Sequence, residues 1–476
     1  MARRPKNTNQ LIEQVNVERM AAEGKCIVKH DDRVVFVPFV APGDVVDVYT
    51  TRKKKTYWEG KAVHFHQYAE DRVDPFCEHF GVCGGCKWQH TPYPQQLAYK
   101  RQQVIDHFQR IAKVPLPEVS PALGSEQTTY YRNKLEFSFS DQRWLTREEL
   151  DQKEVTYDRR ALGFHVPGSF EKVLPIHHCY LQPDPSNAIR LAIDEYAKAN
   201  DIPYYSARRH TGILRTLMIR NTTQGEFMVV VQFGGDAQDE DHQPMIIDLL
   251  NHVRSTFPDL TSLQYVINPK KNDTFHDLTV VLHSGQDYLT ERMGELQFRI
   301  SAQSFYQTNS EQAHRLYEVV REMAQLTGQE YVYDLYSGTG TIANFVAGQA
   351  RRVVGLEYVR TAVADARVNS EINGIENTQF VAGDIKDLLR PALIEKHGRP
   401  DVVITDPPRT GMHPDVVKQL LAMESPRLVY ISCNPATQAR DVALLAKKYD
   451  VTQVQPVDMF PHTHHVENVA LLEIRA

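Results

Sequence analysis

The sequence predicts an α/β protein in three parts, of which the C-terminal part is a largely parallel sheet with helices on both faces. Three observations predict this fold. From about residue 300 onward, continuous apolar strands alternate with helical segments, as in parallel sheets with helical crossovers. Residues 10–68 hold short segments rich in Val, Tyr and Phe with turn residues between them, which indicates a small β-barrel of the oligonucleotide-binding (OB) type. A mixed α+β region separates the two.

The predicted domain boundaries follow these changes in pattern. Residues 1–68 form the barrel, residues 69–300 the mixed middle domain, and residues 301–476 the α/β domain. Residues 95–114 are predicted to be an amphipathic helix with its charges on one side. For the barrel, a purely structural module without a ligand remains an alternative.

Composition and charge are those of an ordinary globular protein, with 42% hydrophobic and 24% charged residues. No apolar run reaches the ~20 residues of a membrane span, and the basic first residues lack the apolar core of a secretory signal. We therefore expect a cytoplasmic protein with no membrane partner. The net charge of −6 disfavours a protein that coats nucleic acid, although Lys and Arg outnumber Asp and Glu in residues 1–70. The run from Arg52 to Lys55 there either contacts phosphate or is a solvated hairpin.

Polar residues end several strands of the predicted C-terminal sheet. The first strand runs into Gly338-Thr339-Gly340, the second ends at Glu357, the third at Asp384 and the fourth at Asp406. In such sheets, ligands bind at the carboxyl ends of the strands. Glu357 suits the two hydroxyls of a ribose, and Asp384 suits an adenine edge. The pattern lacks the third glycine of a dinucleotide fingerprint, so it predicts some other adenosine-containing cofactor.

A cysteine and a glutamate stand at the ends of two further strands. Cys433 follows the fifth strand and precedes a helix, where the helix N-terminus is expected to lower the pKa of its thiol. A buried, inert cysteine is the alternative. Glu467 precedes the last strand and is expected to reach the same crevice, where a thiolate and a carboxylate suit a nucleophile and a proton acceptor. The nearby histidines lack the helical spacing of common zinc ligands.

These motifs resemble the RNA uracil-5-methyltransferase family, in particular its iron–sulfur-containing 23S ribosomal RNA branch. The resemblance covers essentially the whole chain and rests on SFYQTN, DLYSGTG, DPPRTG, SCNPATQARD and DMFPHTHHVE. It implies an N-terminal TRAM domain that binds RNA and a Rossmann-like, S-adenosylmethionine-dependent methyltransferase domain. It also implies that Cys433 attacks carbon 6 of a uracil, that carbon 5 takes the methyl group, and that Glu467 removes the carbon-5 proton.

The resemblance also implies the cofactor contacts. These are Gln307, Tyr336, Gly338, Glu357, Asp384 and Asp406. The sequence departs from the family pattern at two places. Tyr336-Ser337 stands where Phe-Cys is common, and Thr341 stands where Asn is common, so no contact is expected from Thr341.

Four of the six cysteines form a separate group, Cys77, Cys83, Cys86 and the distant Cys179. Four thiolates suit either an iron–sulfur centre or zinc. The spacing is similar to the family's ligands for a [4Fe–4S] cluster, and this likeness favours iron–sulfur over zinc. For Cys26 we expect no role beyond that of a small apolar residue.

The predicted substrate is an unpaired or flipped-out uridine in 23S ribosomal RNA, because a paired base cannot reach a buried thiol. The run from Tyr130 to Lys134 is either an aromatic and basic clamp for RNA or the start of a structural strand. A transfer RNA methyltransferase and a non-catalytic RNA-binding protein are the main alternatives. A radical enzyme is disfavoured because the CxxxCxxC signature is missing, and an amino methyltransferase because Arg409 follows Asp406-Pro407-Pro408. By the same resemblance we expect a monomer.

Overall fold

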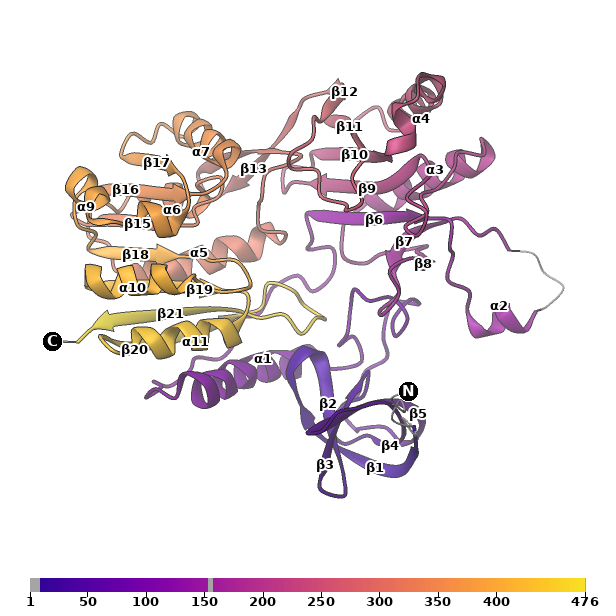
Figure 1. Ribbon diagram of the computed structural model, residues 1–476, viewed down its shortest axis with the longest axis horizontal. Helices are drawn as coiled ribbons and strands as arrows, with labels where there is room; N and C mark the ends of the chain where they lie inside the picture. The colour runs from indigo at the N-terminus through magenta and orange to yellow at the C-terminus, as the bar shows by residue number, and fades with distance from the viewer. Residues whose placement is uncertain (1–8, 153–156, 476) are drawn as a thin grey trace, which may run out of the picture.

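The computed structural model describes residues 9–152 and 157–475; residues 1–8, where the first predicted domain begins, lie outside the described residues, as do 153–156 and 476. Within the described residues the chain forms a closed β-barrel, a mixed seven-stranded sheet and a C-terminal sheet that also has seven strands (Figure 1). The small barrel and the C-terminal α/β fold are therefore confirmed. In the part of the chain that is described, no helix is both long and apolar enough to cross a membrane.

The barrel closes in the order β1-β2-β3-β5-β4, with β3 and β5 parallel and its other neighbours antiparallel. Its core consists of alternating aliphatic side chains such as Val28, Val35 and Val46. Cys26 is fully buried among them, and its thiol donates to the carbonyl of Val40 at 3.0 Å. The strands are β1 (Leu11–Met20), β2 (Lys25–His30), β3 (Arg33–Pro38), β4 (Val45–Lys53) and β5 (Tyr57–Gln67).

The middle of the chain forms a seven-stranded sheet in the order β12-β11-β10-β9-β6-β7-β8. Helices α3 (Ser186–Ala199) and α4 (Gln243–Thr256) share one hydrophobic core with this sheet. The interior strand β10 is buried along its whole length. The strands are β6 (Lys134–Ser140), β7 (Ala161–His165), β8 (Val173–Pro175), β9 (Leu214–Asn221), β10 (Phe227–Gly234), β11 (Ser262–Asn268) and β12 (Val281–Gly285).

The C-terminal sheet has the order β17-β16-β15-β18-β19-β21-β20. The first five strands in this order are parallel, and β21 lies antiparallel between β19 and β20. Their interiors are continuous runs of buried Val, Ile, Leu and Tyr, as expected for a sheet covered on both faces. The strands are β15 (Tyr331–Leu335), β16 (Arg352–Glu357), β17 (Thr378–Ala382), β18 (Val402–Thr405), β19 (Arg427–Ser432), β20 (Tyr449–Val457) and β21 (Glu467–Ile474).

Helices cover both faces of this sheet. One face carries α5 (Ser310–Ala324), α6 (Thr341–Ala347) and α7 (Arg360–Ile372), which join a short hairpin of β13 (Tyr288–Met293) and β14 (Leu296–Ser301). The other carries α10 (Pro414–Met423) and α11 (Pro435–Leu445), with the short α8 (Ile385–Leu388) and α9 (Pro391–His397).

The predicted amphipathic helix is α1 (Tyr93–His107), which continues as one wider turn to Ala112. It precedes the middle sheet in sequence, yet it packs against α11 and β20 of the C-terminal domain (Figure 1). Its apolar residues Val104 and Phe108 are fully buried there. The N-terminal third of the chain therefore supplies part of the cover of the C-terminal sheet. A short five-residue helix, α2 (Arg147–Asp151), lies in the middle region.

A buried ion pair fixes α1 to the segment between β20 and β21. Lys100 Nζ donates to Asp458 Oδ1, and at 3.1 Å to the carbonyl of Phe460. Both charged side chains are 0% exposed. Burial lowers the pKa of Lys100, and Asp458 opposes this shift. The two charges therefore depend on each other, because neither reaches water.

We predict that Lys100→Met lowers the stability of the protein by about 3–5 kcal/mol, since it leaves Asp458 buried without a counter-charge. Thermal unfolding of the purified variant measures the effect. The double variant Lys100→Met/Asp458→Asn should recover part of the loss, because it removes both charges. Losses that simply add in the double variant would contradict a mutual dependence of the two charges.

Candidate active site and four-cysteine pocket

The carboxyl edge of the C-terminal sheet gathers most of the residues that the sequence singled out. Tyr336, Glu357, Asp406 and Cys433 lie at or just beyond the ends of β15, β16, β18 and β19, which are parallel neighbours. Asp384 lies two residues beyond the end of β17. Parallel strands end at one edge, so the topology brings these residues to a single crevice.

The pairing of β19 with β21 brings Cys433 and Glu467 together. Ser432 is the register partner of Asn468 in this antiparallel pair. Cys433 and Glu467 are the next residue on each strand, so they lie beside each other at the same edge. Glu467 is 4% exposed, whereas Cys433 is partly exposed. The thiol therefore has access to the crevice, with a buried carboxyl group next to it.

The turn after β15 holds Glu357 in a fixed orientation. The backbone N–H of Gly338 donates to Glu357 Oε2 at 3.0 Å, and the N–H of Val359 donates to Oε1 at 2.7 Å. Tyr336 and Gly338 have positive φ values of 64° and 52°, which aims this turn back toward β16. A Cβ atom added to Gly338 would meet nothing within 4 Å, so open space adjoins the turn.

Several buried acids lie near one another at this crevice, and their ionised forms repel one another. Burial and the nearby Asp406 hold the pKa of Asp334 well above its usual range. Burial raises the pKa of Asp406 to about 7, and burial together with Asp406 raises that of Glu467 to about 8. Arg409 opposes the shift of Glu467. A cation in the crevice would relieve this repulsion, so an adenosine-containing cofactor with a positive charge fits the residues present.

The thiol of Cys433 differs from the sequence-based expectation. Its pKa was expected to fall at the N-terminus of α11, but burial, with Glu467 and Asp406 nearby, raises it to about 12. Arg409 acts in the opposite direction and does not compensate. The expectation was wrong because the adjoining carboxyl groups belong to strands that are distant in sequence. The dipole of the short α11 is weaker than desolvation and two nearby acids.

Gln307 and Tyr317 lie on the α5 side of the crevice. Gln307 is 8% exposed, and its carbonyl accepts a 2.8 Å hydrogen bond from Asn133 Nδ2. Its side chain is hydrogen-bonded to Tyr317, whose pKa is raised by burial and by Asp406, Asp334 and Glu467. No pattern in the sequence indicates Tyr317, because its place on the apolar face of α5 is that of an ordinary core residue.

Asp384 has a local structural role as well as its place at the strand end. Its carboxylate caps α8 by accepting from the N–H of Lys386 at 3.2 Å, and it pairs with Lys386 Nζ at 2.8 Å. The hydrogen bond from Lys386 holds its pKa below the usual range. Gly383 next to it donates to the carbonyl of Glu357 at 2.8 Å, which ties this turn to the end of β16. A contact of Asp384 with adenine stays a prediction.

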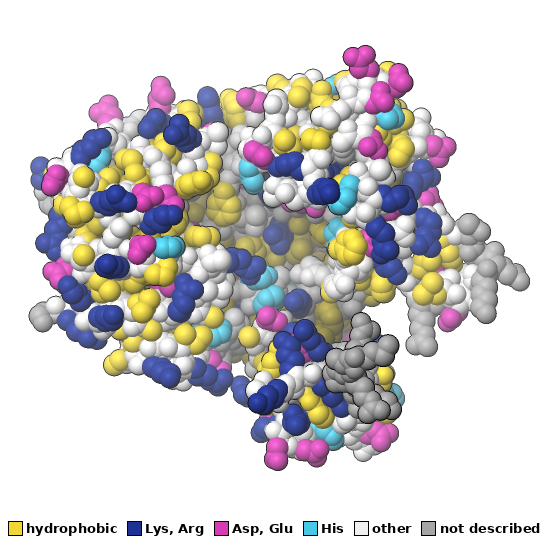
Figure 2. Space-filling model, viewed as in Figure 1, with side chains coloured by type: hydrophobic (Ala, Val, Ile, Leu, Met, Phe, Trp, Pro, Cys, Tyr) yellow, Lys and Arg dark blue, Asp and Glu magenta, His cyan; other side chains and the backbone are white. Residues whose placement is uncertain are grey.

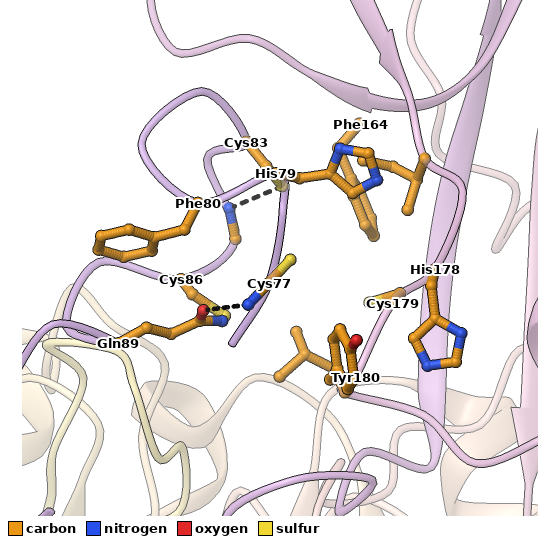
Figure 3. A pocket seen from close by; sticks show the side chains of 13 residues that line it. Cys77, His79, Phe80, Cys83, Cys86, Gln89, Phe164, His178, Cys179 and Tyr180 are labelled. Atoms are coloured by element: carbon orange, nitrogen blue, oxygen red, sulfur yellow. Dashed lines mark hydrogen bonds between the residues drawn. The ribbon is translucent and has the colours of Figure 1, made fainter. Parts of the chain in front are cut away.

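The four grouped cysteines line one pocket (Figure 3). Cys77, Cys83 and Cys86 come from the loop before α1, and Cys179 comes from the segment after β8. Phe80, Phe164, Ile176 and Leu181 help to line about 400 Å³ of space between the side chains, part of it open to solvent. All four thiols are free. Burial raises the pKa of each thiol, to about 11 for Cys83 and about 12 for Cys86.

A buried guanidinium group lies beside this pocket. Arg190 is 1% exposed and donates to the carbonyls of Ile176 and His177 and to Asn187 Oδ1. Asn187 Oδ1 also accepts from the N–H of Cys179 at 2.8 Å. Within the described residues Arg190 makes no ion pair, and burial lowers its pKa to about 10 while Cys179 opposes the shift. An anionic group in the pocket would compensate this charge, so thiolates that hold a metal centre fit the residues present.

Histidines near the two sites have hydrogen-bonding and packing roles. His462 packs edge-on against Phe76 with 5.1 Å between ring centroids, and Arg409 donates to His465 Nδ1 at 2.9 Å. Glu78, His79 and His177 also approach one another beside the pocket. The N–H of His177 donates to His79 Nε2 at 3.0 Å, so that nitrogen is already engaged.

The side chains of the aromatic and basic run before β6 differ in their exposure to solvent. Tyr130 is 37% exposed, has a positive φ of 55° and hydrogen-bonds His178 at 3.0 Å. Tyr131 and Asn133 are buried, and Tyr131 donates to the carbonyl of Pro461 at 3.0 Å. The run therefore contains both exposed residues and residues with a structural role, so neither alternative describes all of it. Only some of the run, with Tyr130 as its exposed aromatic residue, is available to RNA.

The basic run of the barrel lies at a hairpin end beside two half-buried aromatic residues. Lys53 Nζ lies 4.2 Å from the ring centroid of Trp58, and Lys54 Nζ lies 4.9 Å from that of Tyr57. On the face in Figure 2 the molecule is hollowed where its three parts meet, and Lys and Arg side chains gather over the barrel beside this hollow. Cations next to aromatic rings suit a phosphate backbone with unstacked bases.

Comparisons with known proteins agree with this arrangement. A family model described as tRNA (uracil-5-)-methyltransferase matches residues 279–475, and one described as the TRAM domain of tRNA (uracil(54)-C(5))-methyltransferase matches residues 14–58. The chain is 57% identical over 458 residues to a protein of Bacteroides thetaiotaomicron named as an uncharacterized RNA methyltransferase, covering 96% of this chain and all of the relative. A protein of the same name from Chlorobaculum tepidum is 39% identical over 95% of this chain and 94% of the relative.

A solved structure extends the likeness to the whole fold. The tRNA (uracil-54, C5)-methyltransferase of Pyrococcus abyssi, solved in complex with S-adenosyl-L-homocysteine, aligns with a TM-score of 0.73 and 26% identity. The alignment covers 96% of this chain and all of that one. Its relatives, the matching family models and its fold together show that the chain belongs to the RNA uracil-5-methyltransferase family and carries an N-terminal TRAM domain.

Proposed function

We propose that the protein transfers the methyl group of S-adenosylmethionine to carbon 5 of a uridine in 23S ribosomal RNA, through a transient bond between Cys433 and carbon 6. The observation that carries this proposal is the register of β19 and β21, which sets Cys433 beside Glu467 at the edge where Glu357 and Asp406 end their strands. We expect the protein to act as a cytoplasmic monomer.

The need for a cysteine follows from the weakness of uracil carbon 5 as a nucleophile. Addition of the Cys433 thiolate to carbon 6 breaks the 5,6 double bond and leaves an enolate. Carbon 5 of this enolate attacks the methyl group, whose bond to the donor sulfur breaks, so that S-adenosyl-L-homocysteine leaves with the bonding electrons. Glu467 then takes the proton from carbon 5. The electrons of that C–H bond re-form the double bond and expel the thiolate, so Cys433 is regenerated.

S-adenosylmethionine supplies the methyl group on a positively charged sulfur. Gln307, Tyr336 and Gly338 would line its place, Glu357 would accept from its ribose hydroxyls, and Asp384 and Asp406 would lie at its remaining polar groups. The support for this assignment is electrostatic as well as topological, because a cation in the crevice offsets the charge of Asp406 and Glu467.

We further propose that Cys77, Cys83, Cys86 and Cys179 hold a [4Fe–4S] cluster. Around one zinc ion with Zn–S bonds of ~2.3 Å, tetrahedral sulfur atoms lie about 3.8 Å apart. Among the ligand groups of the described residues, no three of these sulfurs lie within 4.8 Å of one another. The spacing favours a larger centre that binds each thiolate at a separate iron. The buried charge of Arg190, which has no ion-pair partner among the described residues, favours a metal centre with a net negative charge.

A uridine in transfer RNA is the second candidate substrate. It is favoured by the matching family models and by the Pyrococcus abyssi structure, all of which are described as acting on transfer RNA. The TRAM model that matches the barrel is itself described for a transfer RNA enzyme, so the barrel does not discriminate. A non-catalytic RNA-binding protein is disfavoured, because such a protein would not need Cys433 and Glu467 side by side.

We expect unmodified 23S ribosomal RNA, labelled with tritium at uridine carbon 5, to release tritium in step with methyl incorporation from S-adenosylmethionine. Release from transfer RNA alone would change the substrate and keep the chemistry.

Cys433→Ala should abolish release and leave cofactor binding unchanged. Glu467→Gln should accumulate a protein–RNA adduct that survives denaturation, and its turnover should fall ~10²–10⁴-fold. Absence of release from both RNAs would contradict the proposal.

The pKa of Glu467 predicts a pH dependence. Because this pKa is raised to about 8, the carboxyl is protonated below that pH and available as a base above it. The kcat/KM for the methyl donor should therefore rise with pH, reach half of its maximum near pH 8 and level off about one pH unit higher. Arg409 lowers this pKa, so Arg409→Gln should move the rising limb to higher pH, whereas Arg409→Lys should hardly move it. A limb that stays in place in Arg409→Gln would contradict the assignment.

The cysteine pocket predicts a metal content. Protein purified without oxygen should contain about four irons with matching sulfide per chain and absorb broadly in the visible range. Cys86→Ser should lose the iron. Arg190→Met should lower the iron content or its lifetime in air, because it removes the buried charge beside the pocket, and Arg190→Lys should lower it less. Colourless protein with one zinc ion per chain would contradict the cluster.

A further inference from the structure

The segment that ends at Glu467 is anchored by the loop that carries the cysteines. Residues 458–466, here called the active-site loop, connect β20 to β21. The backbone N–H groups of Lys87 and Trp88 both donate to the carbonyl of His462, at 2.8 and 3.0 Å. These two residues follow Cys86 directly. One carbonyl of the active-site loop is therefore held by the backbone next to a cysteine of the pocket.

A buried glutamine completes this connection. Gln96 of α1 is 0% exposed, and its Oε1 accepts from the N–H of His462 at 2.8 Å. Its Nε2 donates to the carbonyls of Trp88 and Thr91 at 3.1 and 2.8 Å, and lies 3.2 Å from His462 Nδ1. Gln96 thus binds both Trp88, the second residue after Cys86, and the active-site loop.

His462 needs these partners because of its backbone. Its φ of 62° is in the left-handed region, which a residue other than glycine keeps only when its surroundings hold it there. Its N–H and its carbonyl are both bound by residues 87–96. If these partners were lost, the local preference of the chain would favour another conformation.

The rest of the active-site loop is tied together, so a shift at His462 reaches Glu467. Phe460 N–H donates to Asp458 Oδ1 at 2.9 Å, Thr463 Oγ1 donates to the carbonyl of Phe460 at 2.8 Å, and His465 N–H donates to Thr463 Oγ1 at 3.3 Å. Tyr131 fixes the carbonyl of Pro461 from the middle domain. Only Val466 separates His465 from Glu467.

We infer that the four-cysteine centre positions the proton acceptor: by holding the backbone after Cys86, it fixes His462 and, through the active-site loop, Glu467. Gln96 and His462 are positioning residues in this connection. The inference rests on the proposed function for its link to catalysis. It gives the cysteine centre a mechanical role, which suits a reaction in which no electron is transferred.

Hydrogen exchange measures the connection directly, because its main bonds are made by backbone N–H groups. In full-length protein, removal of the metal by chelation or by Cys86→Ser should speed exchange at Lys87, Trp88 and His462 at least tenfold. Slow exchange at these amides in protein shown to be free of metal would overturn the inference. This readout needs no RNA and no turnover, so it stands apart from any failure of the proposed activity.

Gln96→Leu separates positioning from metal binding. Its iron content should match the wild type, exchange in residues 458–466 should speed up, and kcat should fall tenfold or more with little change in KM for RNA. Gln264→Leu is the matched control, since Gln264 in β11 is 3% exposed and also donates to a backbone carbonyl. It should lower the melting temperature and leave kcat and loop exchange unchanged.

A second variant covers the case in which Gln96→Leu does not fold. Gln96→Glu keeps the acceptor for the N–H of His462 and loses the donors to Trp88 and Thr91, so its exchange and kcat should lie between wild type and the metal-free protein. Unchanged kcat in a Gln96 variant whose active-site loop exchanges fast would overturn the link to Glu467. Equal losses of kcat in the Gln264 control would reduce the effect to general destabilisation and would likewise overturn it.

Discussion

Burial of several acids at the carboxyl edge of the C-terminal sheet is the constraint on which the rest of the site depends. The topology gathers Asp334, Asp406 and Glu467 at this edge, and burial raises the pKa of each, so their ionised forms are disfavoured. Arg409 offsets only part of the shift of Glu467. A positively charged methyl donor, as proposed for this crevice, would favour the ionised forms. Binding of such a donor and deprotonation of these acids would then be linked, because one charge acts on all of them.

The position of Glu467 depends on parts of the chain outside the sheet that carries it. The antiparallel insertion of β21 sets the register with β19, but the nine residues before it make few bonds to the sheet itself. Their anchors come from α1 through Lys100 and Gln96, from the cysteine loop through Lys87 and Trp88, and from the middle domain through Tyr131. This explains why α1 packs against the C-terminal domain. The first third of the chain thus helps to build the site, in addition to any contact with RNA.

Patterns along the sequence predicted the strands, the helices and the residues at the strand ends. The roles that were missed depend on contacts between segments that are distant in sequence. Strand and helix alternation predicted the sheet, and parallel strands necessarily brought Glu357, Asp406 and Cys433 to one edge. Tyr317, Arg190 and Gln96 gave no signal, since each acquires its role from partners that are far away in sequence. The sign of the Cys433 shift was missed for the same reason. For the run at Tyr130 the sequence left both alternatives open, because the burial of Tyr131 depends on a distant partner, the carbonyl of Pro461.

The high pKa of the Cys433 thiol is compatible with its proposed role as a nucleophile. With a pKa of about 12, the thiol is almost wholly protonated at neutral pH, so the free protein exposes little reactive thiolate to oxidants. Burial is the main cause of this raised pKa, and Glu467 and Asp406 add to it. A cationic donor in the crevice would offset the part that the two acids contribute, so it would lower the pKa of the thiol. In the proposed reaction the thiolate would therefore be favoured after the donor has bound, whereas a thiol activated by a helix N-terminus would be reactive at all times.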